Sequence, residues 1–264
     1  MKIKFFCDFT SSQNVINNFT VEKKTTYFTT GDDFTHAILL NTAMPNLTIP
    51  KENVVGLAFE PRCFLDITHE FVEYAKKHVK LYYIGDAKNL PLPFVEHHGF
   101  LWHSPLNSIN FKCKLMSIII SNKKVTEGHI YRHKITQWIY ENDLPIDIYG
   151  FGSNQFNGMG YFDDYTPYTN YFFSICIENT KCNEYFSEKI SNALVNNCIP
   201  VYYGANNINR YFEGQVIELI GDFTEDTNLI KRILLNPSNY LVEIKSEENA
   251  KKLNLIEHLP LIFK

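Results

Sequence analysis

The sequence contains no apolar run that is long enough to cross a membrane. A membrane-spanning helix needs about 20 consecutive apolar residues, and no stretch of the 264 residues approaches that length. The apolar run at residues 2–9 is too short for the core of a signal peptide, and no small-residue cleavage site follows it. We therefore expect a soluble, cytoplasmic chain without a membrane anchor.

Basic residues are also not in excess. The chain has 25 Lys and Arg against 29 Asp and Glu, a formal net charge of −4, and no basic run. Nucleic-acid-binding domains usually carry a basic patch or excess, so the composition disfavours a nucleic-acid partner. The cysteines are few, far apart and mostly within apolar runs, at Cys7, Cys63, Cys113, Cys176, Cys182 and Cys198. We interpret them as reduced, buried thiols rather than a disulfide framework.

Short apolar runs alternate with helical stretches along the whole chain. We expect strands at residues 2–9, 36–41, 54–60, 80–85, 99–103, 114–121, 146–150, 171–178, 199–204 and 216–220. We expect helices at residues 64–78, 129–142 and 226–236, where apolar residues recur at helical spacing. The strands are apolar throughout rather than alternating, which is typical of parallel sheets covered on both faces. The pattern predicts an α/β fold.

Two such α/β series follow one another in the chain. The polar, turn-rich stretch at residues 105–112 divides them, as a linker would. We therefore expect two Rossmann-like domains facing each other across a cleft, at residues 1–108 and 109–264. The closing helices, from about residue 239 onward, could pack back on the first domain.

Ligands of parallel sheets bind beyond the carboxyl ends of the strands, so the residues that follow each strand are candidates for chemistry. In the first half these residues include Asp8, Glu60 and Asp86. Pro61 holds Glu60 in an extended conformation, and Arg62 comes two residues later. Glu60 and Arg62 form either a surface ion pair without a role or part of a site in which Glu60 acts as a general base.

Other patterns give weak signals. The glycine-rich stretch at residues 149–160 follows an expected strand, but its third glycine is misplaced for a dinucleotide-binding loop. His97, His98 and His103 lie close together without a carboxylate or cysteine pattern that would complete a zinc site, and the helix that begins near His69 lacks the second histidine of a zinc protease.

Lys189 has an unusual position. If a helix starts near Glu184, then Tyr185, Glu188 and Lys189 share one face of it. A cation in the first helical turn opposes the helix macrodipole. A bound phosphate would resolve this conflict, because both the ammonium and the free N–H groups attract it. Asn179, at the end of the preceding strand, could offer its amide to the same anion. The alternative is that Glu188 and Lys189 are solvated surface charges.

The stretch at residues 177–204 resembles the donor-binding motif of the α1,3-fucosyltransferase family. The family carries Glu-Asn-Ser or Glu-Asn-Thr, four residues, Tyr, two residues and Glu-Lys, followed by an Asn-Ala-Leu-like helix and a Pro-Val strand that ends in Gly. This chain matches those spacings at Glu178-Asn179-Thr180, Tyr185, Glu188-Lys189, Asn192-Ala193-Leu194, Pro200-Val201 and Gly204. The resemblance covers about the last 130 residues and rests in the first half on Glu60 and its neighbours.

The resemblance implies a GT-B glycosyltransferase that moves fucose from GDP-fucose to a glycan hydroxyl with inversion at the sugar carbon. By the motif match, Asn179, Tyr185, Glu188 and Lys189 would contact the nucleotide sugar, and Arg132 lies near the place of the family's phosphate-binding arginine. The catalytic residue would be Glu60. In one departure, Phe172 stands where the family often has lysine.

No metal or other cofactor is expected beside the donor substrate. No Asp-x-Asp stands at a strand end in the second half of the chain, so we expect a metal-independent enzyme in which cations and a helix N-terminus stabilise the departing GDP. Two alternatives remain at this point: a GT-B transferase that uses another nucleotide sugar such as GDP-mannose, and a glycan- or nucleotide-binding module without catalysis.

Overall fold

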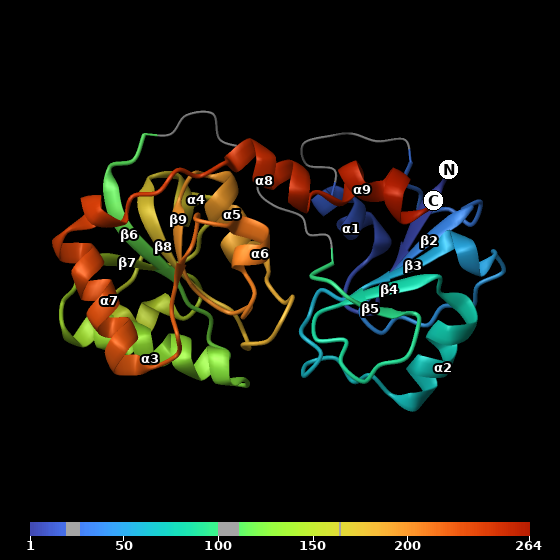
Figure 1. Ribbon diagram of the computed structural model, residues 1–264, viewed down its shortest axis with the longest axis horizontal. Helices are drawn as coiled ribbons and strands as arrows, with labels where there is room; N and C mark the ends of the chain where they lie inside the picture. The colour runs from blue at the N-terminus through green and yellow to red at the C-terminus, as the bar shows by residue number, and fades with distance from the viewer. Residues whose placement is uncertain (20–26, 100–110, 164) are drawn as a thin grey trace. The chain divides into compact units, whose positions relative to one another are not determined.

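The structure is a computed structural model that describes residues 1–19, 27–99, 111–163 and 165–264. The chain forms two compact units, each built on its own parallel sheet (Figure 1). The first unit holds the described residues up to 99 together with Cys182–Tyr185 and Lys252–Lys264. The second holds residues 111–181 and 186–251. The expected boundary at residue 108 and most of the expected linker lie outside the described residues.

Within its described residues, the first unit has five parallel strands that neighbour one another in chain order. They are β1 (Ile3–Phe6), β2 (His36–Leu40), β3 (Val54–Leu57), β4 (Leu81–Ile84) and β5 (Phe94–Glu96). Because every strand lies next to its predecessor, the described part of this sheet contains no point at which the strand order reverses.

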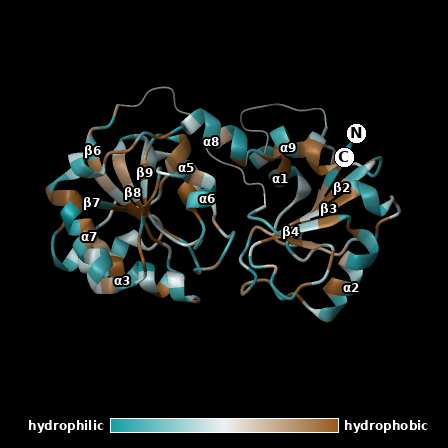
Figure 2. Cartoon of the chain, viewed as in Figure 1, coloured by the Kyte–Doolittle hydropathy of each residue, from teal (hydrophilic) through white to brown (hydrophobic). Residues whose placement is uncertain are grey.

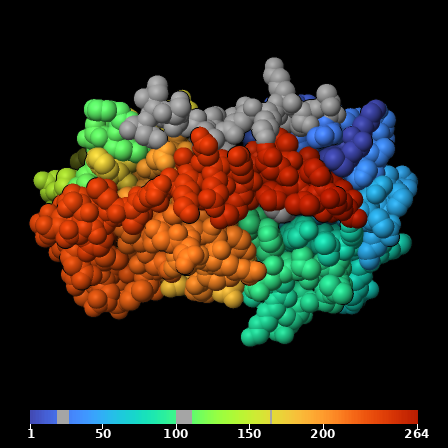
Figure 3. Space-filling model, turned by 45° about the horizontal axis from the view of Figure 1, so that its top comes forward, coloured from blue at the N-terminus to red at the C-terminus, as the bar shows by residue number. Residues whose placement is uncertain are grey.

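Helices cover both faces of the first sheet. They are α1 (Ser12–Phe19), α2 (His69–His78) and α9 (Leu255–Ile262), with the 3-10 turn η1 (Lys51–Asn53) between strands. Ile38 and Leu40 of β2 pack in one core cluster with residues of α1 and α9, whereas Ala37 and Leu39 pack with α2 on the other face. This alternation follows from the period of two in a strand. The helix α9 lies at the surface of the unit (Figure 3).

The described part of the second unit has five parallel strands in the order β10-β9-β8-β6-β7. They are β6 (Lys114–Ile119), β7 (Ile146–Tyr149), β8 (Tyr171–Ile177), β9 (Ile199–Tyr203) and β10 (Ile217–Glu218). From β6 the chain first adds a strand on one side and then returns to add β8 on the other side. The strand order therefore reverses between β6 and β8, where ligands of open α/β sheets bind.

Helices also flank the second sheet. They are α3 (Glu127–Glu141), α4 (Thr166–Thr169), α5 (Glu188–Val195), α6 (Asn209–Phe212), α7 (Phe223–Leu235) and α8 (Ser246–Leu253), with the 3-10 turns η2 (Ser153–Phe156) and η3 (Pro237–Tyr240). Ile135 of α3 and Ile230 of α7 join the core cluster on one face of the strands. On the other face, Ser117 donates to the Pro167 carbonyl of α4 and Cys176 to the Lys189 carbonyl of α5. The strands, which lie between the two layers of helices, are the most hydrophobic part of the unit (Figure 2).

Most expected elements are confirmed, with differences at their ends. The helix expected from residue 64 begins only at His69, because Thr68 accepts the N–H of Phe71 and caps it. The strand expected at 99–103 lies almost wholly outside the described residues. The strand β5 was not predicted, because Pro91 and Pro93 border it; proline is tolerated on an edge strand such as this one.

The cysteines are only partly as expected. Cys176 and Cys198 are buried, and burial raises the pKa of each thiol. The expectation of burial is wrong for Cys63 and Cys113, which are exposed and follow turn or loop residues rather than lying inside strands. Among the described residues, no helix combines the length and the apolar character needed to cross a membrane.

Replacing Gly56 by alanine should destabilise the first unit. A Cβ on Gly56 would lie 1.9 Å from the ring of Tyr82 on the neighbouring strand, and Tyr82 is fully buried. We expect a loss of about 1–3 kcal/mol from overpacking, measured by urea unfolding. The control is Gly31→Ala, whose nearest contact is the exposed Asp33 carboxylate; equal effects of the two substitutions would contradict the explanation.

Candidate functional site

The end of β8 and the start of α3 meet at the point where the second sheet reverses its strand order. Glu178 and Asn179 directly follow Ile177, the last residue of β8. The N–H of Gly128, in the first turn of α3, donates to the Asn179 carbonyl at 3.1 Å. A Cβ on Gly128 would lie 2.0 Å from the Glu178 carbonyl oxygen. Only glycine therefore allows α3 to approach the strand end this closely.

Arg132 of α3 orders the same strand end. Its Nε donates to the Ile177 carbonyl at 3.0 Å, and its Nη2 donates to Oδ1 of Asn179 at 3.3 Å. The guanidinium is buried, so it places a fixed positive charge at the switch point. Because Oδ1 of Asn179 accepts from Arg132, the amide nitrogen of Asn179 is oriented as a hydrogen-bond donor.

The helix that carries Lys189 starts later than expected. α5 begins at Glu188 after the N-cap Ser187, so the expected start near Glu184 is wrong. Glu184 has a φ of 58°, in the left-handed region, which breaks the helical path. Tyr185 therefore does not share a helical face with Glu188 and Lys189. It belongs to the first unit, where its backbone lies against Gly85.

Lys189 is the second residue of α5, in the first turn as the sequence predicts. Its ammonium lies 2.9 Å from Ser187 Oγ, 3.1 Å from Glu188 Oε1 and 3.5 Å from Glu178 Oε2. The chain itself therefore supplies anions that offset the unfavourable placement of a cation at this helix end. The alternative of a solvated surface lysine is wrong, because the side chain is only 19% exposed.

The innermost of these anions is Glu178, to which sequence reasoning gave no role. Its side chain has no exposed surface. Oε1 accepts the N–H of Ser187 at 2.8 Å, and Oε2 accepts the Ser187 hydroxyl at 2.7 Å. The carboxylate thus caps the start of α5 as an external anion would. The sequence did place an acidic residue directly after a buried strand. Its partner, Ser187, lies nine residues further along the chain, so the spacing did not indicate the contact.

Glu188 and Lys189 hold each other in the ionised state. Burial lowers the pKa of Lys189, but the Glu188 and Glu178 carboxylates outweigh it and raise that pKa above its ordinary value. Burial likewise raises the pKa of Glu188, but the Lys189 ammonium outweighs it and leaves that pKa below its ordinary value. Because the Glu188 side chain is 46% exposed, it is the partner of Lys189 that an incoming anion can replace with the least rearrangement.

Phe172 stands at the position where the family motif often has lysine. It is partly buried and packs against the hydrophobic core of the second unit. An apolar residue is therefore accommodated there by the packing, and this position offers no charge to a donor substrate.

In the first unit, Glu60 lies three residues beyond β3, at the carboxyl end of that strand. Asn41 holds the backbone between β3 and Glu60 in place, because its Oδ1 accepts the N–H of Phe59 at 2.9 Å. Arg62 donates to the carbonyl oxygens of Asp86 and Lys88, at 3.2 and 2.5 Å. The Arg62 side chain therefore has a structural role, because it connects the loop that contains Glu60 to the loop after β4.

The weaker sequence signals do not form sites among the described residues. The glycine-rich stretch after β7 leads into the 3-10 turn η2 rather than an α-helix N-terminus that could bind a dinucleotide. His97 stacks on His98, with ring centroids 4.2 Å apart, while His103 lies outside the described residues. No group of three His, Cys, Asp or Glu side chains within the described ranges is placed to hold a metal ion.

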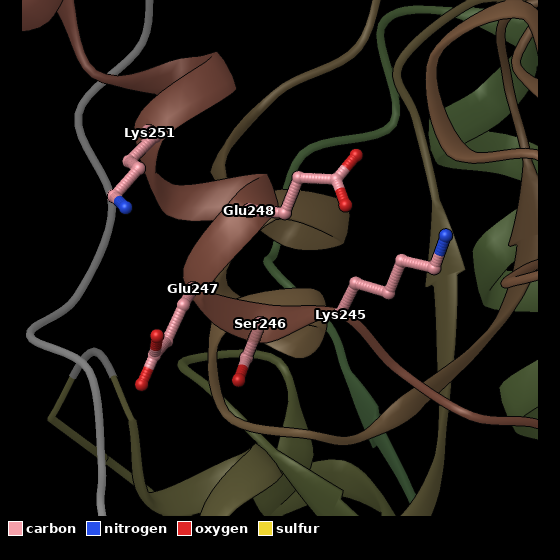
Figure 4. Close-up of a pocket in the computed structure, with 5 residues that line it drawn as sticks. All are labelled: Lys245, Ser246, Glu247, Glu248 and Lys251. Atoms are coloured by element: carbon pink, nitrogen blue, oxygen red, sulfur yellow. The ribbon is translucent and has the colours of Figure 1, made fainter.

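An open pocket of about 470 Å³ lies at the start of α8 (Figure 4). Its lining consists of one short segment, with Lys245, Ser246, Glu247, Glu248 and Lys251. In Figure 4 these side chains point in different directions rather than toward a common centre. Mixed charges on one exposed helix do not form a convergent site, so the candidate site remains the switch point between β6 and β8.

Comparison with known proteins identifies relatives of the same region. The family model described as glycosyltransferase family 10 (fucosyltransferase), C-terminal part, matches residues 109–241. A protein from Danio rerio, GDP-fucose protein O-fucosyltransferase 3, is 27% identical over 137 residues. That match covers 50% of this chain and 29% of the relative, so the chain spans less than a third of this curated relative's length.

Solved structures with a similar fold are glycosyltransferases of the GT-B type. An α1,3-fucosyltransferase with GDP has a TM-score of 0.53 and 13% identity, over 100% of this chain and 90% of that one. S. aureus TarM has a TM-score of 0.55 and 12% identity, over 86% of this chain and 55% of that one. At these identities the likeness shows the fold alone, which is the GT-B fold that the sequence predicts.

Replacing Glu178 by glutamine should destabilise the second unit. The substitution leaves the Lys189 ammonium without its innermost anion and removes an acceptor from Ser187. We expect a loss of roughly 3 kcal/mol in the free energy of unfolding, as for other broken buried pairs. Urea unfolding measures it against Glu188→Gln, whose side chain is 46% exposed and should contribute less than about 1 kcal/mol. A smaller loss of stability in the Glu178 variant than in the Glu188 variant would refute the claim that Glu178 contributes more.

Proposed function

Because the chain belongs to glycosyltransferase family 10, the fucosyltransferases, we propose that it transfers fucose from GDP-fucose to a glycan hydroxyl with inversion at the sugar carbon. The observation that carries this proposal is the buried cluster at the switch point of the second sheet. There Arg132 and Lys189 place two cations at the strand end where nucleotides bind in such folds.

The donor would bind through its diphosphate. In this proposal the phosphates replace Glu188 as the outer partner of Lys189, and Ser187 and Glu178 keep the ammonium in place from the inner side. The amide nitrogen of Asn179 donates to the same diphosphate, and the fixed charge of Arg132 adds to the attraction. The carboxylate of Glu188 then accepts hydrogen bonds from ribose or fucose hydroxyls, and Tyr185 contacts the nucleotide sugar.

The reaction would be a direct displacement. Glu60 takes the proton of the acceptor hydroxyl while that oxygen attacks the anomeric carbon of fucose and the bond to GDP breaks. Such help from a general base typically contributes about 10²–10⁴-fold to the rate. Negative charge grows on the leaving diphosphate, where Lys189, Arg132 and Asn179 stabilise it without a metal ion.

The class of molecule that accepts the fucose is the least specified part of the proposal. The Danio rerio relative is named as a protein O-fucosyltransferase, which favours a protein hydroxyl as a second candidate acceptor. Mass spectrometry of a glycan array and of a folded-protein panel, each incubated with GDP-fucose and with EDTA present, distinguishes the two. Mass gains of one fucose on glycans support the main proposal, and gains only on proteins support the second. No transfer of fucose to either panel would overturn both candidates.

Replacing Lys189 by alanine should weaken the binding of GDP. The loss of one charge-assisted hydrogen bond to the diphosphate corresponds to a dissociation constant about 10–100-fold higher, measured by titration calorimetry. The control is Lys231→Ala, because Lys231 of α7 lies over the Trp138 ring instead. Unchanged affinity in the Lys189 variant would remove the donor-site assignment.

Replacing Glu60 by glutamine should slow turnover strongly and leave donor binding intact. Glutamine keeps the shape of the side chain but cannot accept the proton, so we expect kcat to fall about 10²–10⁴-fold. Steady-state kinetics measure kcat, and calorimetry with GDP shows whether affinity is retained. The same change at Glu52, elsewhere in the first unit, is the control. A Glu60 variant with full activity would exclude it as the general base.

A further inference from the structure

His129 is a buried histidine of the second unit to which the motif match assigns no role. It occupies the first turn of α3, next to Gly128, and is only 3% exposed. Gly128 contacts the backbone of Glu178 and Asn179. The backbone next to His129 is therefore held at the strand end by the same close approach that brings Arg132 to Asn179.

The hydroxyl of Thr126 is the partner of Nδ1, and the tautomer that we assign to the ring follows from a hydroxyl that donates to it. The N-cap Thr126 accepts the backbone N–H of His129, and its Oγ1 lies 2.6 Å from Nδ1 of the ring. The hydroxyl proton is thus available to donate to Nδ1, which leaves the ring proton on Nε2. Among the described residues no hydrogen bond is formed by Nε2, and Nε2 is not one of the fully buried polar atoms that lack a partner, so it reaches solvent. A residue that is almost wholly buried therefore keeps one ring nitrogen, Nε2, that no described residue binds.

Positive charges surround the ring from several elements. They are Arg132 and His133 of α3, Lys189 of α5 and Lys123 of the loop after β6. Two carboxylates of the cluster, Glu178 and Glu188, are already paired with Lys189, and Glu127 in the same helical turn accepts hydrogen bonds from the Thr180 hydroxyl and the Lys181 N–H. Burial, followed by the charge of Arg132 and then of Lys189, lowers the pKa of His129 to about 4. The imidazole is therefore neutral near pH 7, and an anion in this cluster would reverse the field that keeps it neutral.

We propose that His129 is a further donor-site residue, whose Nε2–H donates to the diphosphate of the nucleotide sugar and whose ring takes up a proton from solvent as the diphosphate binds. The proton is added at Nδ1, and the Thr126 hydroxyl rotates so that its oxygen accepts from the new N–H. This inference rests on the proposed function, because it requires a sugar nucleotide at this site. The protonated ring then adds a third positive charge beside Lys189 and Arg132 as GDP departs.

Titration calorimetry with GDP-fucose in buffers of different ionisation enthalpy tests this directly. The two phosphates of GDP-fucose carry one charge each and do not titrate in this range, so a buffer-dependent heat reports protons taken up by the protein. We expect uptake of up to one proton per GDP-fucose near pH 6. His129→Gln, which retains an N–H donor but cannot be protonated, should bind GDP-fucose without this uptake. His133→Gln, four residues further along α3, should retain it, because Nε2 of His133 is bonded to the Ser121 carbonyl.

The pH dependence of the unsubstituted protein gives a second measurement that does not depend on a variant folding. Proton uptake requires the affinity for GDP-fucose to rise as the pH falls from 7 to 5.5, by at most tenfold per pH unit for one proton. Binding without proton uptake, or equal uptake in His129→Gln, would overturn the role of His129 and leave the proposed function standing. Failure of the unsubstituted protein to bind GDP-fucose would overturn both.

Discussion

The second unit depends on a buried carboxylate at the end of a strand. Glu178 binds the N–H and the hydroxyl of Ser187 and lies 3.5 Å from the Lys189 ammonium. It thereby joins β8 to the start of α5 and makes a cation stable at a helix end that normally repels one. An unpaired buried carboxylate would be very costly, so the position of Lys189 and the cap of α5 are determined together.

The topology of the sheet gives this interaction its place. Because the strand order reverses between β6 and β8, the helices α3 and α5 diverge from the strand ends at that point. Gly128 lets α3 approach the backbone of Glu178, and Arg132 orients Asn179. Groups from a strand end and two helices are thus brought together, with cations beside a half-exposed carboxylate that a ligand can displace. The fold positions these groups, and the family membership of the chain indicates the chemistry for which they are suited.

Much of this architecture was predictable, and the failures have physical causes. Continuous apolar runs identified the parallel strands, and motif spacing located Asn179, Glu188 and Lys189. The helix start near Glu184 was wrong because periodicity cannot detect the left-handed backbone of that residue. Glu178 was missed because its importance comes from complete burial and from a partner nine residues away. The internal ion pairs of Lys189 were likewise invisible, so the sequence pointed only to an external anion.

A crystal structure of the protein with GDP tests the central claim most directly. The account predicts the diphosphate within hydrogen-bond distance of the Lys189 ammonium and the Asn179 amide, with Glu188 turned away from Lys189 and Glu178 still bound to Ser187. Diphosphate density elsewhere in the molecule, with Lys189 still paired to Glu188, would contradict it.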